Sequence, residues 1–237
     1  MSLKEVTSFL FDLDGTLTDY EAGCEAGLKA ALKILNAERE RPLDYELFLE
    51  AYNAVIDAES TWSSSGGFRL PARENRIRRF KMLFDGFGFQ AGPILQDMAD
   101  AYGVGRATGT RLFQDVKPLL DYMVDKYRLG VITEGSVETQ REQLQGQKIE
   151  GYFEVVVISG ETPWHKPDKN LYQLAATKLK TETENIVMVG DRLDWDIGPA
   201  KEIGMQTVYL DRGQSSKGIV TLDPEPDYVV FDLNELQ

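Results

Sequence analysis

The sequence has little cysteine, little histidine and no long apolar run. Its single cysteine, Cys24, rules out an intrachain disulfide, and we expect a cytoplasmic protein because reducing compartments favour free thiols. No apolar stretch approaches the roughly 18 residues of a transmembrane helix, and the N-terminus lacks a signal-peptide pattern. We therefore expect no membrane partner.

Positive charge is also scarce, since 26 Lys and Arg residues stand against 39 Asp and Glu residues. The formal net charge of −13 argues against binding to nucleic acid or to an anionic membrane surface, both of which favour a basic face. An anionic small molecule would need positive charge supplied locally, by a metal ion, a lysine or a helix N-terminus.

What the chain has in quantity is alternating strand and helix. Its 237 residues are enough for one large α/β domain with a smaller insert. After an N-terminal strand at 6–11, apolar strands are expected at 129–133, 153–159, 186–190, 206–210 and 228–230, with helices at 115–126, 136–148, 170–180 and 197–203. The alternation predicts a doubly wound, mainly parallel, Rossmann-like sheet, whose ligands bind at the carboxyl ends of the strands.

Residues 18–110 interrupt this alternation. Helices are expected at 22–37, 45–59, 71–84 and 92–102, without a strand between them. We therefore expect an α/β core formed by residues 1–17 and 111–237, and an inserted helical cap domain at 18–110.

Asp12 and Asp14 mark the end of the first strand, where it gives way to Gly15. Alternation along an extended chain points both side chains the same way. Two neighbouring carboxylates at a buried strand end are costly unless a cation holds them, and carboxylate oxygens suit Mg²⁺. The alternative is a polar turn that caps the strand.

Three further segments lie near the ends of later strands. Thr133 precedes a helix start whose free N–H groups, together with the hydroxyl, would bind a phosphoryl group; alternatively it is only a helix N-cap. Lys166 precedes a helix-opening proline, and its alternative is a solvated surface charge. The last segment carries three carboxylates, which act as ligands or cap the next helix: Asp191, Asp194 and Asp196.

The order and residue types of these four segments resemble the haloacid dehalogenase-like hydrolase superfamily, and the resemblance covers essentially the whole chain. It implies that Asp12 is the nucleophile and that Asp14 is the general acid and base. It also implies that Thr133, Glu134 and Lys166 bind the phosphoryl group, with Lys166 neutralising the aspartyl-phosphate. The helical insert would then be a cap of the family's C1 type.

The same resemblance implies a magnesium site. Its ligands would be Asp12, the backbone carbonyl of Asp14, and Asp191. Asp194 and Asp196 would act from behind, by orienting the ligands or the lysine. Superfamily members that cleave carbon–halogen bonds usually lack the second aspartate, because a halide leaves without a proton and an alkoxide does not. Asp14 therefore favours phosphoryl transfer.

The expected activity is Mg²⁺-dependent hydrolysis of a small organic phosphate monoester. Two alternatives stay open, a phosphosugar mutase that uses the same aspartyl-phosphate and a non-catalytic binding protein of the same fold; a dehalogenase is least favoured. We expect a monomer or a homodimer. Specificity is assigned to the insert and its hinge, where the arginines are either substrate contacts or a solvated basic face. The candidates are Thr18, Arg69, Arg73 and Arg76.

Glu134 departs from the family, which often has Asn, Ser or Ala at this position. A carboxylate aimed at a phosphate would repel it by a few kcal/mol at moderate effective dielectric. We favour a side chain that turns away, so that only the N–H contributes. The alternative is that Glu134 contacts a cationic or hydroxyl-rich part of the substrate.

Overall fold

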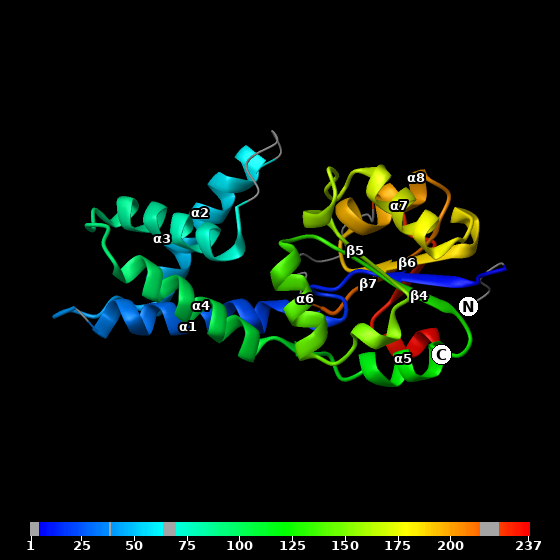
Figure 1. Ribbon diagram of the computed structural model, residues 1–237, viewed down its shortest axis with the longest axis horizontal. Helices are drawn as coiled ribbons and strands as arrows, with labels where there is room; N and C mark the ends of the chain where they lie inside the picture. Colours follow the sequence, from blue (N-terminus) through cyan, green and yellow to red (C-terminus); the bar gives the residue numbers. More distant parts are fainter. Residues whose placement is uncertain (1–4, 38, 64–69, 214–222) are drawn as a thin grey trace. The chain divides into compact units, whose positions relative to one another are not determined.

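The computed structural model describes residues 5–37, 39–63, 70–213 and 223–237 (Figure 1). The chain divides into two compact units, one formed by Met1–Asp19 with Leu112–Gln237 and the other by Tyr20–Arg111. The insert predicted at 18–110 starts two residues before the second unit begins at Tyr20. It ends one residue before that unit ends at Arg111. No helix in these described ranges is both long enough and apolar enough to cross a membrane.

The first unit contains a six-stranded sheet in the order β5-β4-β1-β6-β7-β8, with every neighbouring pair parallel. Its strands are β1 (Ser8–Phe11), β4 (Arg128–Thr133), β5 (Val155–Ile158), β6 (Ile186–Gly190), β7 (Gln206–Leu210) and β8 (Tyr228–Val230). The chain builds outward from β1 on one side and then on the other, so the topological switch point lies at β1. The predicted α/β fold class is confirmed.

Both faces of the sheet are covered by helices. These are α5 (Val116–Met123), α6 (Val137–Gly146), α7 (Lys169–Leu179) and α8 (Gly198–Glu202). Phe9 and Phe11 of β1 pack on the side of α5 and α6, whereas Leu10 between them packs on the side of α7 and α8. Figure 1 shows α7 and α8 on one side of the strands and α5 on the other. Burial on both faces explains the continuous apolar run of β1.

Short helical turns connect these elements. They are η1 (Glu150–Tyr152), η2 (Ser159–Glu161), η3 (Thr183–Asn185), the π-helical turn η4 (Leu193–Ile197) and η5 (Leu233–Leu236). The helix expected at 197–203 is the short α8, because η4 occupies the turn before it. A separate two-stranded sheet pairs β2 (Thr18–Asp19) with β3 (Arg111–Leu112).

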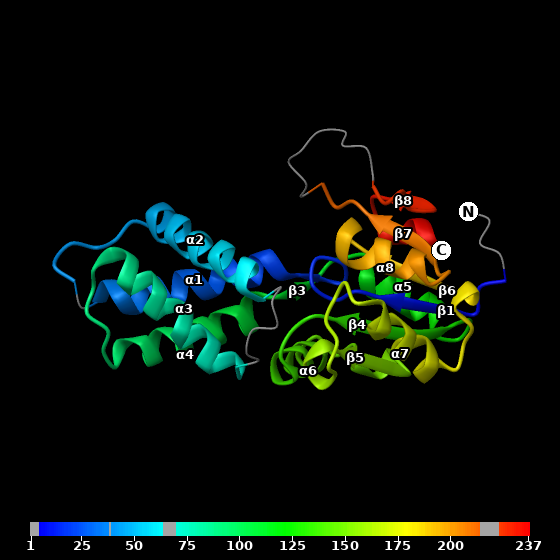
Figure 2. The same ribbon diagram turned by 90° about the horizontal axis from the view of Figure 1, so that it is seen from above.

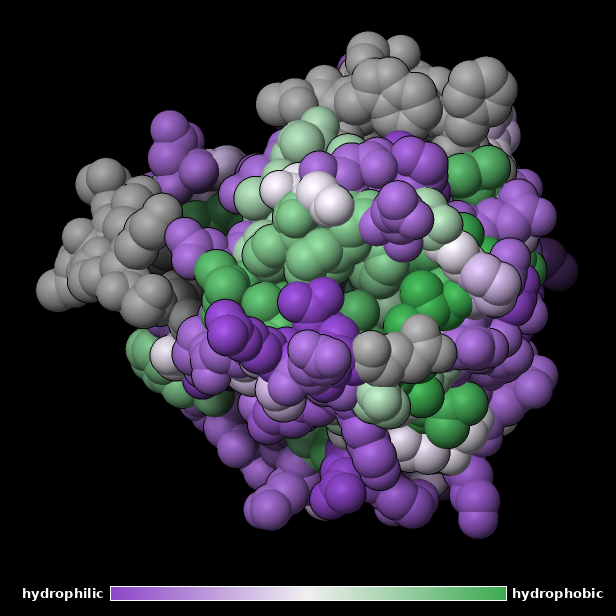
Figure 3. Space-filling model, turned by 90° about the vertical axis from the view of Figure 1, so that its left-hand side faces the viewer, coloured by the Kyte–Doolittle hydropathy of each residue, from purple (hydrophilic) through white to green (hydrophobic). Residues whose placement is uncertain are grey.

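The second unit is helical, as the sequence predicts. It contains α1 (Tyr20–Ala37), α2 (Tyr45–Ser63), α3 (Ala72–Phe87) and α4 (Ile94–Gly109), shown from above in Figure 2. Its core includes the buried side chains of Phe48, Phe80 and Met98. The helix expected at 45–59 continues to Ser63. On the face drawn in Figure 3, polar side chains surround a central area of apolar ones.

Candidate active site

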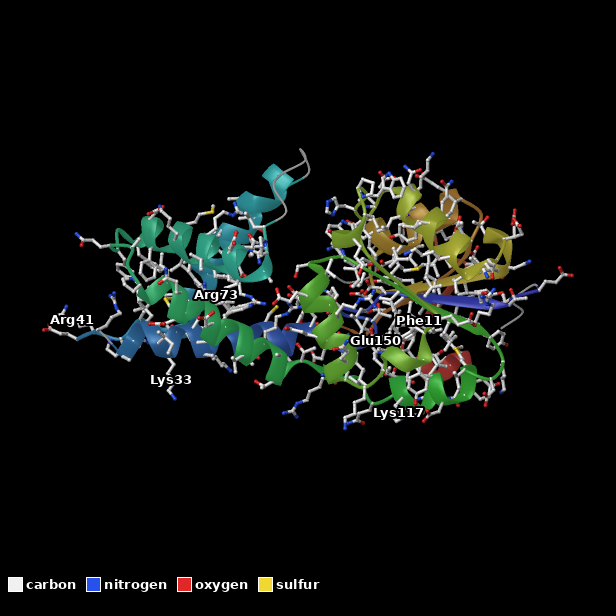
Figure 4. All side chains as sticks on the ribbon, in the orientation of Figure 1. Phe11, Lys33, Arg41, Arg73, Lys117 and Glu150 are labelled. Carbon is white, nitrogen blue, oxygen red and sulfur yellow. The ribbon has the colours of Figure 1, made fainter. Side chains whose placement is uncertain are left out.

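Three predicted site residues lie where neighbouring strands end. Asp12 directly follows β1, Thr133 is the last residue of β4, and Asp191 directly follows β6. The Asp12 N–H donates to the Val189 carbonyl at 2.9 Å, which extends the pairing of β1 and β6 by one residue. Phe11, labelled in Figure 4, lies in the sheet immediately before Asp12. The carboxyl edge of the sheet at its switch point thus carries the candidate chemistry.

Lys166 joins two carboxylates at this edge. Its Nζ donates to Asp12 Oδ1 at 2.6 Å and to Asp196 Oδ1 at 2.6 Å. All three residues are buried, with Lys166 only 5% exposed. A lysine so placed is not a solvated surface charge, because a buried ammonium persists only when anionic groups surround it.

The pKa values follow from this burial. Burial raises the pKa of Asp12 to about 6, although Lys166 acts in the opposite direction. Burial likewise raises the pKa of Asp196 to about 6, again opposed by Lys166. For Lys166, burial works to lower the pKa, but the charges of Asp12 and Asp196 outweigh it and hold the pKa well above its usual 10.5. Near pH 7.5 Lys166 is therefore a cation and Asp12 is mostly a carboxylate.

A metal ion fits between Asp12 and Asp191. Among the described residues, Asp12, Asp191 and Asp196 form a group whose carboxylate oxygens lie within 4.8 Å of one another. Within the same part of the chain, Asp12 Oδ2 is buried and has no hydrogen-bond partner. Both oxygens of Asp196 are already bonded, to Lys166 and to the Arg192 N–H. Hard carboxylate oxygens are the ligands that Mg²⁺ prefers, and Asp12 and Asp191 are the better placed to supply them.

Two glycines allow the loops of this site to approach each other. Gly15 has a φ of +94°, and a Cβ on it would lie 2.4 Å from Asp191 Oδ2. A Cβ on Gly190 would lie 2.4 Å from the Cβ of Asp196. Any larger residue at either position would therefore push a carboxylate out of place.

The side chain of Asp14 lies outside the carboxylate group and is held by helix α6. Gln143 Nε2 donates to Asp14 Oδ1 at 2.5 Å, and Gln140 Nε2 donates to Asp14 Oδ2 at 3.1 Å. The Thr18 hydroxyl donates to Asp14 Oδ1 at 3.3 Å and accepts from Gln143 at 2.8 Å. Thr18, predicted as a specificity residue, is thus a buried neighbour of Asp14.

Thr133 is fully buried, and its hydroxyl donates to Gln140 Oε1 at 3.3 Å. It is not the N-cap of the following helix. That position belongs to Ser136, whose side chain accepts from the Thr139 N–H. The alternative interpretation of Thr133, as only a helix N-cap, is therefore wrong.

Glu134 turns towards the loop that carries Lys166. Its Oε2 accepts from the Lys166 backbone N–H at 3.1 Å, and its Oε1 lies 2.7 Å from His165 Nδ1. Both carboxylate oxygens therefore have partners within the protein. The carboxylate thus links the strand end at Thr133 to the catalytic-lysine candidate.

Asp194 is placed differently from Asp196, although only two residues separate them. Its side chain is 67% exposed and pairs with Arg192 at 3.2 Å. Asp196 is 1% exposed and bonds Lys166. Both carboxylates were candidates to orient the lysine. Within the described residues, Asp196 accepts a hydrogen bond from Lys166 and Asp194 does not.

The predicted specificity arginines belong to the second unit. Arg73, labelled on α3 in Figure 4, donates to both carboxylate oxygens of Asp100 at 2.6 and 2.9 Å, and both side chains are exposed. The Arg76 guanidinium lies 5.6 Å from the centre of the Tyr102 ring. Arg69 lies outside the described residues.

Sequence reasoning missed Gln140 and Gln143. The helix that carries them is largely polar, so nothing in the sequence marks these two amides among its other polar side chains. Their spacing of three residues places them on one face of α6. That spacing, close after Thr133, is the one local signal that could have found them.

Comparison with known proteins agrees with this geometry. The sequence pattern of the haloacid dehalogenase-like hydrolases matches residues 6–204. Glyceraldehyde 3-phosphate phosphatase of Methanocaldococcus jannaschii is 35% identical over 233 residues, which cover 98% of this chain and 95% of the relative. N-acylneuraminate-9-phosphatase of Homo sapiens is 27% identical, over 100% of this chain and 94% of the relative.

Solved structures show the same fold. A HAD hydrolase of Bacillus subtilis bound to magnesium aligns with a TM-score of 0.76 at 22% identity, over 98% of this chain and 97% of that one. A 2-haloacid dehalogenase of Pseudomonas syringae aligns with a TM-score of 0.68 at 24% identity, over 98% and 96%. Because the family pattern spans most of the sequence and the sequence relatives match end to end, the chain belongs to the haloacid dehalogenase-like hydrolases, as a phosphatase-type member.

Proposed function

We propose that the chain is a Mg²⁺-dependent phosphatase that hydrolyses a small organic phosphate monoester through an aspartyl-phosphate on Asp12. The state of the Asp12 side chain carries this proposal. One of its oxygens is held by Lys166, and the other is buried with no hydrogen-bond partner among the described residues. A carboxylate arranged in this way suits a nucleophile beside a metal ion.

The reaction consists of two displacements at phosphorus. The Asp12 carboxylate attacks phosphorus, the P–O bond to the substrate breaks, and Asp14 gives a proton to the departing oxygen. Water then attacks the phosphorus of the aspartyl-phosphate, Asp14 takes a proton from that water, and Asp12 is regenerated as phosphate leaves. Lys166 balances negative charge beside Asp12 as that charge grows in each transition state.

The remaining groups bind and orient. The backbone N–H groups at the start of α6 would bind the phosphoryl oxygens, together with the Thr133 hydroxyl once its proton turns from Gln140 Oε1 to the phosphoryl group. Asp12, Asp191 and the backbone carbonyl of Asp14 would hold the Mg²⁺. The ion supplies the charge that offsets repulsion between the anionic nucleophile and the anionic phosphate. Asp196 orients Lys166 and does not contact the substrate.

The substrate class is inferred from the relatives. The two described above are named for glyceraldehyde 3-phosphate and for N-acylneuraminate 9-phosphate, a short and a long phosphorylated sugar. We infer a phosphorylated sugar or a closely related small ester for this chain. Its single cysteine further supports a cytoplasmic location for the reaction.

A panel of phosphorylated sugars and small phosphorylated alcohols, assayed for phosphate release with Mg²⁺ and with EDTA, tests the proposal. Mg²⁺-dependent release by the wild-type protein, and none by Asp12→Asn, is expected. Appearance of an isomeric sugar phosphate with a bisphosphate activator, in place of free phosphate, would instead identify a mutase. Failure to turn over any ester with Mg²⁺ would favour a non-catalytic binding protein.

A further inference from the structure

Both carboxylate oxygens of Asp14 are bonded to amides from one helix. Gln143 Nε2 lies 2.5 Å from Oδ1, and Gln140 Nε2 lies 3.1 Å from Oδ2. The two glutamines stand three residues apart on α6, so their side chains project from the same face of the helix. One rigid element therefore grips Asp14 at two points.

The neighbouring groups fix which end of the Gln140 amide faces Asp14. Gln140 Nε2 also lies 3.1 Å from the Glu134 carbonyl, and a carbonyl and an ionised carboxylate can only accept. The nitrogen must therefore face both of them, which leaves Gln140 Oε1 to accept from the Thr133 hydroxyl at 3.3 Å. Gln140 is only 2% exposed. A buried amide with both ends bonded is a built arrangement rather than an incidental surface contact.

This network connects the group proposed to bind the phosphoryl group with the group proposed to transfer the proton. Through Gln140, the hydroxyl proposed to bind the phosphoryl group is connected to the carboxylate proposed to move the proton. Two donors on two different oxygens fix the plane of a carboxylate, which a single bond would leave free to turn. Proton transfer in a phosphoryl-transfer step depends on such alignment.

We propose that Gln140 and Gln143 are positioning residues, which hold the Asp14 carboxyl group in the orientation from which it exchanges a proton with the ester oxygen. This rests on the function proposed above. Neither glutamine needs to touch the substrate. Their removal should therefore lower kcat/KM only for esters whose leaving group requires a proton, because the later attack of water does not enter kcat/KM.

The test compares two esters by kcat/KM, which reports the steps up to departure of the leaving group. Glycerol 1-phosphate releases an alkoxide that needs a proton, whereas p-nitrophenyl phosphate releases a stable phenolate that does not. For Gln143→Met we expect kcat/KM to fall at least about 10-fold with glycerol 1-phosphate and to stay within about 3-fold with p-nitrophenyl phosphate. Asp14→Asn should show the same split with a larger loss, of about 10²- to 10⁴-fold.

Two further variants keep the test sharp. Gln145→Met makes the same substitution at an exposed position of α6 and should change neither ester's rate. Gln140→Met should repeat the split, with an added loss on both esters because Thr133 also loses its acceptor. Equal losses on the two esters for Gln143→Met, or no loss on either, would overturn the positioning role while leaving the phosphatase intact. A wild-type protein inactive on these two esters and on every member of the panel described above would overturn the phosphatase, and this role with it.

Discussion

The Nζ of Lys166 lies 2.6 Å from Oδ1 of Asp12, and both side chains are buried at the carboxyl edge of the sheet. The attraction is shared with Asp196, on the other side of the same ammonium group. In the proposed mechanism this pair acts in the reaction as well as in the folded state. Its removal should therefore be visible in both.

Replacing Lys166 with Met should lower kcat/KM by at least about 100-fold, because a fixed positive charge is lost beside the transferring phosphoryl group. Two buried carboxylates would also be left unpaired, which should reduce the free energy of unfolding by about 3–5 kcal/mol. Urea unfolding in EDTA measures the second effect. The exposed Lys201, paired with Asp227, provides the control as Lys201→Met, which should change stability little.

The stability loss of Lys166→Met should depend on pH in one direction. Asp12 and Asp196 already have pKa values of about 6 in the folded protein, above those of an unfolded chain, and losing the cation raises them further. Groups whose pKa is raised by folding favour the folded state at low pH and oppose it as the pH rises through the folded pKa. The difference in unfolding free energy between the wild-type protein and Lys166→Met should therefore become smaller as the pH is lowered from 8 to 5. A deficit that grows on acidification would contradict the proposed pairing.

Mg²⁺ should stabilise the folded protein, and the effect should fade in acid. Burial raises the pKa of Asp191 to about 6, with Asp196 as a further cause, and Asp12 has a similar pKa. Ligation needs both carboxylates ionised, so Mg²⁺ should bind more weakly below about pH 6. At a concentration 100 times its Kd the ion adds about 2.7 kcal/mol, which thermal unfolding detects as a higher Tm.

Asp191→Asn and Asp194→Asn make a matched pair for this measurement. Asp191 belongs to the buried carboxylate group, whereas Asp194 lies exposed beside Arg192. The first variant should lose the Mg²⁺-dependent rise in Tm, and the second should keep it. Retention of the rise by Asp191→Asn would contradict this site, and its loss in Asp194→Asn would show that the exposed carboxylate also holds the ion.

Glu134→Ala should impair the reaction without distinguishing between leaving groups. Its carboxylate holds the backbone N–H of Lys166, so its loss loosens the position of a group that acts on the phosphoryl centre. We expect kcat/KM to fall by a similar factor, about 10-fold, for alkyl and aryl esters, because misplacement of a catalytic group is costly for both. Glu138→Ala, exposed in the first turn of α6, is the control. An unchanged kcat/KM would leave Glu134 without a role in placing the lysine.

The sheet could be predicted closely because its signals are local. Apolar runs bounded by polar turns gave β6 and β7 the bounds that the structure has, since strands buried on both faces read as continuous apolar segments. The bounds of the edge strand β8 also agree, although Val229 is exposed. The turn before α8 was missed because a π-helical turn has no periodic apolar pattern. The second helix of the insert was predicted too short, at 59 rather than Ser63.

The residues of the candidate site that lie at the ends of strands could be predicted from the sequence. Asp12, Thr133 and Asp191 stand at strand ends, and topology alone brings those ends together. The partners of Asp14 could not be named, because tertiary packing decides which polar side chains of α6 turn inward. Tertiary packing also decides between Asp194 and Asp196, which are close in sequence although the first is exposed and the second is buried.

The arginines of the second unit give a prediction about specificity. Arg73 is engaged by an exposed carboxylate, and water screens such pairs so strongly that the guanidinium can be released at little cost. If it contacts substrate, Arg73→Ala should change the relative kcat/KM values across a panel of sugar phosphates, as should Arg76→Ala and Arg69→Ala. If kcat/KM changed by the same factor for every ester, the arginines would form only a solvated basic face and would not contact substrate. Lys81→Ala, an exposed position on the same helix as Arg73, is the control.

The covalent intermediate offers the most direct measurement. Wild-type protein mixed with substrate and Mg²⁺, quenched in acid within a turnover and digested, should yield a peptide carrying a phosphoryl group on Asp12. Borohydride reduction before digestion should convert that residue to homoserine, and Asp12→Asn should give neither product. A phosphoryl group found on another side chain, or steady turnover by Asp12→Asn, would contradict the account.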